Sequence, residues 1–212
     1  MAEEAKAERT VVKKVKNAVY YSDGTLRVTD IRISYPHLDK KWCKNPAKDT
    51  PAFSCVGILP KETHQEAIDL CLEVVDIILK EQMKGERVKA DAKFIRDGDL
   101  AAKPEYENAY TINSREENRP IVLNPDKSEM DIEDIKPTIT AGHYTDMLIQ
   151  PWLQNNEHGK RVNASLRAVR YRREGPALTE GSGISKETAI SSFDDDEDGG
   201  FGGDTDDENG GL

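Results

Sequence analysis

The chain has 212 residues, and its 40 acidic side chains outnumber its 30 basic ones to give a net charge of −10. Hydrophobic residues make up 36% of the chain, below the about 45–50% of a typical globular protein, so we expect one modest core with appendages. No apolar run approaches the roughly 18–20 residues that span a bilayer, and the polar first ten residues are not expected to form a signal peptide. These features disfavour a membrane protein and a secreted protein.

Cysteine and histidine usage argues against a disulfide framework and against a metal site. Cys43, Cys55 and Cys71 are widely spaced and form no C-x-x-C pair, which points to a reducing compartment. The four histidines are scattered, and no Cys/His pair has the spacing of a zinc finger. We therefore interpret these residues as core and surface side chains, and we expect no metal and no cofactor.

The negative charge is concentrated in the last part of the chain. Residues 193–212 contain nine acids and no Lys or Arg, and removing them would change the net charge from −10 to −1. Residues 1–173 hold 29 bases and 28 acids, whereas residues 174–212 hold 12 acids and one base. The chain is therefore a nearly neutral body followed by a polyanion, and the overall charge says little about what the body binds.

Four segments are predicted from these shifts in composition. Residues 1–10 are expected to be flexible, 11–173 to form the folded domain, and 174–192, rich in Ser, Gly and Thr, to form a flexible linker. Residues 193–212 have too few apolar side chains to offset the entropy of ordering, so we expect a disordered acidic tail. A flexible linker of this length reaches roughly 25 Å, far enough to bring the tail back over the domain.

The first half of the domain is predicted to be strands followed by a helix. Two β-branched and aromatic runs, 11–21 and 25–35, flank turn residues at 22–24, and a polar loop at 37–50 precedes a third strand at 52–59. The helix after Pro60 is predicted to begin at a capping box of Thr63 and Glu66 and to end near Gly85. Its apolar face has helical spacing and consists of Ile68, Cys71, Leu72, Val75, Ile78 and Leu79.

The second half is predicted to be short strands joined by polar loops. Residues 86–108 carry no clear pattern, and 125–137 are expected to form a loop. Strands are predicted at 109–114, 120–123, 138–142, 143–153 and 161–171, the last two forming a hairpin around an Asn-rich turn. Many short strands with one main helix and long loops favour a mainly β domain, a small barrel, over a βαβ fold.

The sequence lacks the motifs of common enzymes. It has no G-x-x-x-x-G-K-[ST], no G-x-G-x-x-G after a strand and no G-x-S-x-G. Asp97 with Asp99, or Asp131 with Glu133 and Asp134, are conceivable metal ligands, but acid runs in loops are usually solvated. We therefore predict no catalytic residues and no enzymatic activity.

One segment, residues 158–173, combines cations with an aromatic ring. It contains six Lys or Arg and no acid in a chain that is acidic overall. Strand alternation predicts that Val162, Ala164, Leu166 and Ala168 face the core and that the polar side chains share the opposite face. Guanidinium groups bind phosphates and aromatic rings stack on unpaired bases, so this strand is a candidate nucleic-acid surface. The alternative is an exposed strand with solubilising charges. The candidate residues are Lys160, Arg161, Arg167, Tyr171 and Arg173.

Two tryptophans are candidates to extend this surface. Trp152 ends the preceding strand, and Trp42 lies in the polar loop beside Lys40 and Lys41. Tryptophan is large and usually buried, so a place in the core is the alternative for each. Basic residues interleaved with aromatics on a β surface suit a single strand, whereas proteins that bind duplexes more often present a helix.

Several segments in order along residues 25–173 resemble the single-stranded-DNA-binding proteins of tailed bacteriophages, a family first catalogued as a domain of unknown function. They are RVTDIRISYPHL, AFSCVGILPKET, NRPIVLN and ITAGHYTDMLIQPWLQNNEHGKRVNASLRAVRYRREG. The resemblance implies a five-stranded OB-fold barrel elaborated with one main helix and long loops. It also implies an acidic tail that competes with DNA and recruits replication proteins. The tail residues in question are Phe193, Asp194, Asp195, Asp196, Glu197, Asp198 and Phe201.

The predicted function is sequence-tolerant binding of single-stranded DNA in phage replication, recombination and repair, in the cytoplasm of the infected bacterial host. The predicted partners are single-stranded DNA and, through the tail, phage or host replication and recombination proteins. Self-association is left open, and no membrane is involved. Three alternatives remain: an RNA-binding module of the same fold, a protein-interaction scaffold whose tail mimics nucleic acid, and a metal-dependent nuclease.

Overall fold

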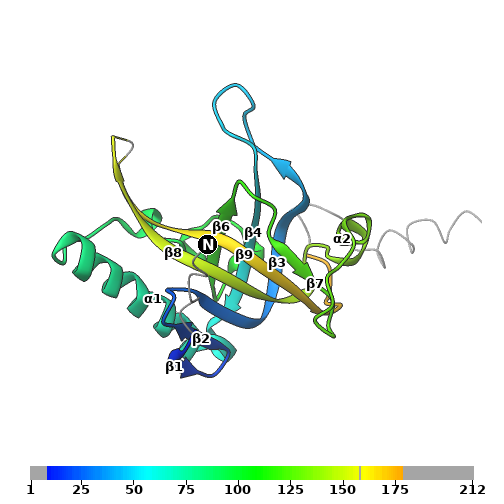
Figure 1. Cartoon of the computed structure of the whole chain (residues 1–212), viewed down its shortest axis with the longest axis horizontal. Coiled ribbons are helices and arrows are strands. Elements are labelled where there is room, and N and C mark those ends of the chain that lie inside the picture. Colours follow the sequence, from blue (N-terminus) through cyan, green and yellow to red (C-terminus); the bar gives the residue numbers. More distant parts are fainter. Residues whose placement is uncertain (1–8, 158, 179–212) are drawn as a thin grey trace, which may run out of the picture. The chain divides into compact units, whose positions relative to one another are not determined.

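One sheet organises the residues that the structure, a computed structural model, describes: 9–157 and 159–178. It contains nine strands (Figure 1). They are β1 (Val11–Val15), β2 (Ala18–Tyr21), β3 (Leu26–Trp42), β4 (Ala52–Pro60), β5 (Ile95–Asp97), β6 (Ala109–Glu116), β7 (Ile121–Leu123), β8 (Tyr144–Asn156) and β9 (Gly159–Arg173). Two α-helices, α1 (Lys61–Met83) and α2 (Ile132–Thr138), complete a mainly β domain, as predicted. Neither described helix is both long and apolar enough to cross a bilayer.

The strand order is β5-β6-β4-β3-β8-β9-β7, with β1 and β2 attached beside β3. All pairs are antiparallel except β7 with β9, and β8 and β9 form the predicted hairpin. The first part of β3, to Arg32, pairs with β8, and the part from Arg32 to Trp42 pairs with β4. The long strand β3 therefore belongs to two ladders.

The strands of the predicted five-stranded barrel do not close into a barrel within the described ranges. The strands β6, β4, β3, β8 and β9 are consecutive in the sheet, but no β-ladder joins β6 to β9 within the described ranges. The two strands meet instead through the Glu116–Arg167 ion pair at 3.1 Å, and a single bridge links Lys93 to Val162. The sheet is therefore open at this seam.

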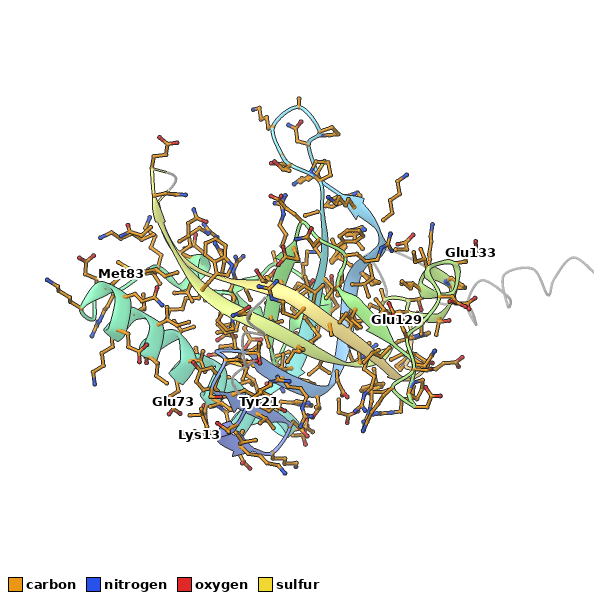
Figure 2. The ribbon with its side chains drawn as sticks, in the orientation of Figure 1. Lys13, Tyr21, Glu73, Met83, Glu129 and Glu133 are labelled. Atoms are coloured by element: carbon orange, nitrogen blue, oxygen red, sulfur yellow. The ribbon has the colours of Figure 1, made fainter. Side chains whose placement is uncertain are left out.

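The core lies between the inner face of the sheet and α1. The apolar positions of α1 predicted from helical spacing are buried, apart from half-buried Leu72. They pack with side chains that alternate inward along the central strands, among them Leu26, Val28, Ile31, Ile33, Met147, Ile149, Val162 and Leu166. On the outer side of α1, Lys13 of β1 pairs with Glu73 (Figure 2).

The start of α1 differs from the prediction. The helix begins at Lys61, directly after Pro60, and no side chain caps it. Thr63 lies inside the helix and its hydroxyl contacts Nδ1 of His64 at 2.8 Å. The Lys61 N–H donates to the Asn108 carbonyl at 3.0 Å, so a tertiary contact replaces the predicted capping box. At the other end Lys84 is the C-cap, with φ 52°, and Gly85 follows it.

Other local predictions differ in their boundaries. The run 11–21 is divided by a turn at Asn17, whose φ is 62°. β3 continues through Trp42 into the segment predicted as a loop, because pairing with β4 supports it. α2 occupies the second half of the predicted loop 125–137 and ends at Thr138, and the rest of the predicted strand at 138–142 is a bend and a turn.

Residues 174–178, the first part of the predicted linker, contact the domain. Arg32 donates to the carbonyls of Gly142 and Pro176. Gly142 has φ +101°, and a Cβ there would lie 2.2 Å from the Pro176 carbonyl oxygen, so this close approach requires glycine. Leu178 packs against the buried cluster of Ile58, Tyr106 and Ala109. The rest of the linker lies outside the described residues.

A buried carboxylate ties β3, β8 and β9 together. Asp146 of β8 has a side chain only 5% exposed. Its Oδ1 accepts from the N–H of Asp30, where β3 is irregular and φ is 58°. Its Oδ2 accepts from Nε of Arg170 at 2.8 Å, and Arg172 lies 3.6 Å away. The charge of Asp146 is therefore compensated by two cations and one backbone donor.

We expect Asp146→Ala to lower the free energy of unfolding by about 3–5 kcal/mol, because it leaves a half-buried arginine without its partner. Urea denaturation followed by circular dichroism measures this change. The exposed Asp76 of α1 provides the control, since Asp76→Ala should change the free energy by less than about 0.5 kcal/mol. Equal midpoints for the two variants would contradict the role given to Asp146.

Candidate nucleic-acid interface

The β8–β9 hairpin presents a polar row on its outer face. Gln150, Trp152 and Gln154 of β8 pair directly with Ser165, Asn163 and Arg161 of β9, in that order. Directly paired residues have side chains on one face. The alternate residues Val162, Ala164 and Leu166 are buried, so the predicted alternation is confirmed from 161 to 166.

Beyond this stretch, two bulges break the alternation. Ile149 pairs with Leu166 and Leu148 with Ala168, so Arg167 is an extra residue in β9. A second irregularity precedes Arg173. A one-residue slip moves the following side chains to the other face, and Tyr171 accordingly packs against the core cluster. Tyr171 therefore does not share the predicted face, whereas the second irregularity reverses the slip, and Arg173 covers the ring of its partner Tyr144.

The open seam between β6 and β9 forms a cleft of about 630 Å³. One wall is the outer row of the β8–β9 hairpin, including Trp152, which is 43% exposed. The other wall consists of β6 with the two residues that follow it, together with Phe94 and Arg96 at β5. The lining residues with polar or aromatic side chains at the surface include Arg96, Asn113, Arg115, Glu117, Trp152, Gln154, Arg161 and Asn163.

Three arginines give the cleft its positive charge. Arg96 Nε donates to the Lys93 carbonyl at 2.9 Å, and Arg161 donates to the Asp91 carbonyl at 3.1 Å. Arg115 donates to the carbonyl of Thr50. Neutral carbonyls orient these guanidinium groups without cancelling their charge. Burial and then the neighbouring charge of Arg161 lower the pKa of Arg96, while Asp91 opposes the shift. An anion placed between them would relieve this repulsion.

Arg167, at the rim of the cleft, is held differently. Its guanidinium donates to Gln150 Oε1 at 2.7 and 3.0 Å and forms the ion pair with Glu116. A carboxylate therefore already compensates the Arg167 charge. Arg161 and Trp152 are the two predicted residues that the structure places together in the cleft itself.

The outer face continues from the cleft onto the β3–β4 hairpin, which extends beyond the sheet (Figure 1). His37 pairs with Ser54, and Ser54 pairs with Arg115, so one row crosses β3, β4 and β6. Trp42 is 51% exposed and stacks on His37 with ring centroids 4.6 Å apart and planes 6° apart. The predicted Trp42 is thus connected to the cleft through Arg115.

Cations accompany Trp42 on this hairpin. Lys41 and Arg119 lie 5.9 and 4.9 Å from the centre of the Phe53 ring, and Lys40 is exposed. Arg119 belongs to the β6–β7 connection, so one of the cations beside the hairpin comes from another part of the chain. The predicted group of Lys40, Lys41 and Trp42 lies together but outside the cleft lining.

The remaining predicted residues lie elsewhere. Lys160, near the tip of the β8–β9 hairpin, pairs with Glu86. Tyr171 packs beside His143, with centroids 5.9 Å apart, and Arg173 pairs with Asp30 while covering the Tyr144 ring at 3.8 Å. The predicted tail residues, Phe193, Asp194, Asp195, Asp196, Glu197, Asp198 and Phe201, lie outside the described residues.

Sequence reasoning missed Arg96, Arg115 and Arg119. Arg96 lies in the segment 86–108, which shows no periodicity, and Arg115 and Arg119 are next to acids and asparagines that mask any local positive charge. The alternating apolar residues of the strand at 109–114 could have placed Arg115 on the outer face with Asn113, but not opposite β9.

Neither group of acids considered as metal ligands forms a metal site among the described residues. Asp97 and Asp99 both bind the ammonium of Lys61, at 2.8 and 2.6 Å. These contacts raise the pKa of Lys61, the hydrogen bonds to Asp97 and Asp99 being the main cause. Within 9–157 and 159–178, no group of three His, Cys, Asp or Glu side chains could hold a metal ion.

An open cleft that combines guanidinium groups, amides and an exposed indole on an antiparallel sheet is characteristic of proteins that bind single-stranded nucleic acid. Comparison with known protein families identifies the family of this chain. Residues 25–201 match the family model described as the ssDNA-binding protein of Enterobacter phage Enc34, and the chain belongs to this family. The family is one of DNA-binding proteins and not of enzymes, in agreement with the prediction from motifs.

Solved structures of a relative support this assignment. The single-stranded DNA-binding protein from bacteriophage Enc34 in complex with ssDNA is 34% identical, with a TM-score of 0.75, over 81% of this chain and 99% of that one. A C-terminal truncation of the same phage protein is also 34% identical, with a TM-score of 0.74, over 84% and 99% of the two chains.

A sequence relative gives a shorter match. The protein p50 of Acyrthosiphon pisum secondary endosymbiont phage 1 is 31% identical over 101 residues, which is 48% of this chain and 51% of that protein. The chain therefore spans about half the length of this curated relative.

We expect both indoles to be accessible in the folded protein, because Trp42 and Trp152 are 51% and 43% exposed. Acrylamide should quench most of the tryptophan emission, and the emission maximum should shift little on unfolding. Trp42→Phe and Trp152→Phe assign the signal to each position. A blue-shifted component that disappears only on unfolding would contradict the exposure of the remaining indole.

Proposed function

We propose that this chain binds single-stranded DNA, the ligand that the name of its phage relative gives for that protein, and that it does so without strong sequence preference. The observation that carries the proposal is the cleft at the β6–β9 seam, where Arg96, Arg115 and Arg161 surround a space lined by exposed Trp152. The open sheet keeps this space accessible. We further infer that the five strands around the seam correspond to the OB-type barrel that the sequence resemblance implies.

The mechanism follows from the cleft. Phosphates bind the three guanidinium groups and release counterions, so affinity falls as salt rises. Bases stack on Trp152, and further along the outer face on the Trp42–His37 pair, each stacked base adding about 1–3 kcal/mol. Stacking needs no particular base, which explains tolerance of sequence. A bound strand cannot form hairpins, and this protects it during replication, recombination and repair in the infected bacterial cytoplasm.

We expect the variant Arg96→Ala/Arg115→Ala/Arg161→Ala to bind oligo-dT about 10-fold or more weakly for each arginine that binds a phosphate in the parent. The slope of log affinity against log salt should fall by about 0.7 for each phosphate that the variant no longer neutralises. Fluorescence anisotropy of a labelled oligonucleotide at several salt concentrations measures both quantities.

Two comparisons sharpen this test. Lys80→Ala, on the exposed face of α1, removes a cation away from the cleft and should leave affinity and slope unchanged. Matched RNA and duplex probes test the rival RNA-binding function, since a preference for RNA would favour it. If the triple variant binds like the parent at every salt concentration, the cleft is not the binding site.

We also propose that the acidic segment 193–212 competes with DNA for the cleft and recruits replication or recombination proteins through Phe193 and Phe201. The support is electrostatic: the segment has nine acids and no base, whereas residues 1–173 are nearly neutral and provide three arginines in one cleft, each bound to a backbone carbonyl. A tethered polyanion has a high local concentration near its own domain.

Deleting residues 193–212 should raise the affinity for oligo-dT, and most strongly at low salt, because salt screens the competition. Titration of the full and truncated chains at low and moderate salt measures the difference. Equal affinity at both salt concentrations would exclude a role of the tail in controlling DNA binding.

A further inference from the structure

Tyr35 is held in a backbone conformation that its side chain disfavours. Its φ is +48°, in the left-handed region, which residues other than glycine rarely adopt and bulky residues adopt least of all. The ring is nevertheless 36% exposed, so burial of the side chain does not explain this backbone conformation. Strained residues persist only where the surroundings fix them, and they cluster at functional sites.

Lys103 fixes the ring of Tyr35. Its ammonium donates to the Tyr35 hydroxyl at 2.7 Å and lies 4.2 Å from the centre of the ring. The same ammonium lies 5.3 Å from the Tyr106 ring and 3.9 Å from Glu105. Tyr106 in turn donates to Ser34 Oγ at 3.3 Å. The exposed ring is therefore anchored at its hydroxyl end by a side chain from another part of the chain.

The position of Tyr35 relates it to the cleft. Ser34 pairs with Val56 and Val56 with Asn113, which forms one row across β3, β4 and β6. The next row is His37, Ser54 and Arg115. Tyr35 and Pro36 are the bulge between the two rows on β3. Both rows end at residues that line the cleft, Asn113 and Arg115, and the second row begins beside the stacked Trp42.

We infer that Tyr35 is a further base-stacking residue for single-stranded DNA and that Lys103 is the residue that positions it. The inference rests on the proposed function and extends it across the outer face, from the cleft to the β3–β4 hairpin. A ring fixed before binding loses little side-chain entropy on stacking, and the nearby ammonium attracts the phosphate of the same nucleotide. The strained backbone lies at the bulge of β3, and the residue that carries it is exposed.

Three substitutions at one position test this inference. Tyr35→Ala and Tyr35→Gly both remove the ring and should weaken binding of oligo-dT by about 5- to 150-fold, with little change in the salt slope. Tyr35→Phe keeps the ring and should bind far more tightly than either. Glycine accepts positive φ, so Tyr35→Gly should have a higher melting temperature than Tyr35→Ala, the reverse of the usual order in a strand.

Lys103→Met tests the positioning role, because it keeps the length of the side chain and removes the ammonium. In the parent, Lys103→Met should weaken binding of oligo-dT. In the Tyr35→Ala background, where there is no ring to position, it should lower the affinity only by the effect of removing one charge. Lys80→Met is the matched control and should change neither affinity nor melting temperature.

The outcomes separate this inference from the proposed function. If the parent does not bind oligo-dT, the proposed function fails. If the parent binds, and the arginine triple variant is weakened while Tyr35→Ala and Tyr35→Gly bind like the parent, the role of Tyr35 is overturned. A loss of stability in Tyr35→Ala and Tyr35→Gly alike, without a loss of affinity, would show that the bulge only shapes the hairpin.

Discussion

The seam between β6 and β9, where side chains meet but no ladder forms, determines what the rest of the domain can do. β3 pairs with β8 along its first part and with β4 along its second, so the neighbours of these strands, β9 and β6, face each other. A hydrogen-bonded seam would bring the strands to roughly 5 Å and fill the space. Here the Glu116–Arg167 pair joins them, and an accessible cleft remains beside it.

The arginines of the domain serve two different purposes. Arg167, Arg170 and Arg173 are each bound to a carboxylate, and they fix strands to one another. Arg96 and Arg161 are oriented by backbone carbonyls and retain their charge for an external anion. Counting basic residues in the sequence cannot distinguish these groups, because the difference lies in what each guanidinium contacts.

The domain combines a stable support with a strained surface. Buried Asp146 and its cations fix the irregular part of β3 where it pairs with β8. Further along the same strand, Tyr35 has positive φ and an exposed ring. Strain of this kind is tolerated because the ladder with β4 holds β3 before and after Tyr35, at Ser34 and at His37, and the cost falls on an exposed position.

The sequence by itself determined the mainly β class, the hairpin of β8 and β9, the helical face of α1 and the alternation from 161 to 166, because each depends on a local periodicity. It also determined the concentration of acids in 193–212 and the family resemblance. Only the tertiary structure decided that the sheet stays open and that a bulge removes Tyr171 from the face of Arg161. It also brought Arg96 and Arg115 opposite β9. One inserted residue at a bulge is enough to turn the following side chains to the other face of the sheet. The cleft brings together segments about 50 residues apart in the chain. Neither feature produces a periodic pattern of apolar residues in the sequence.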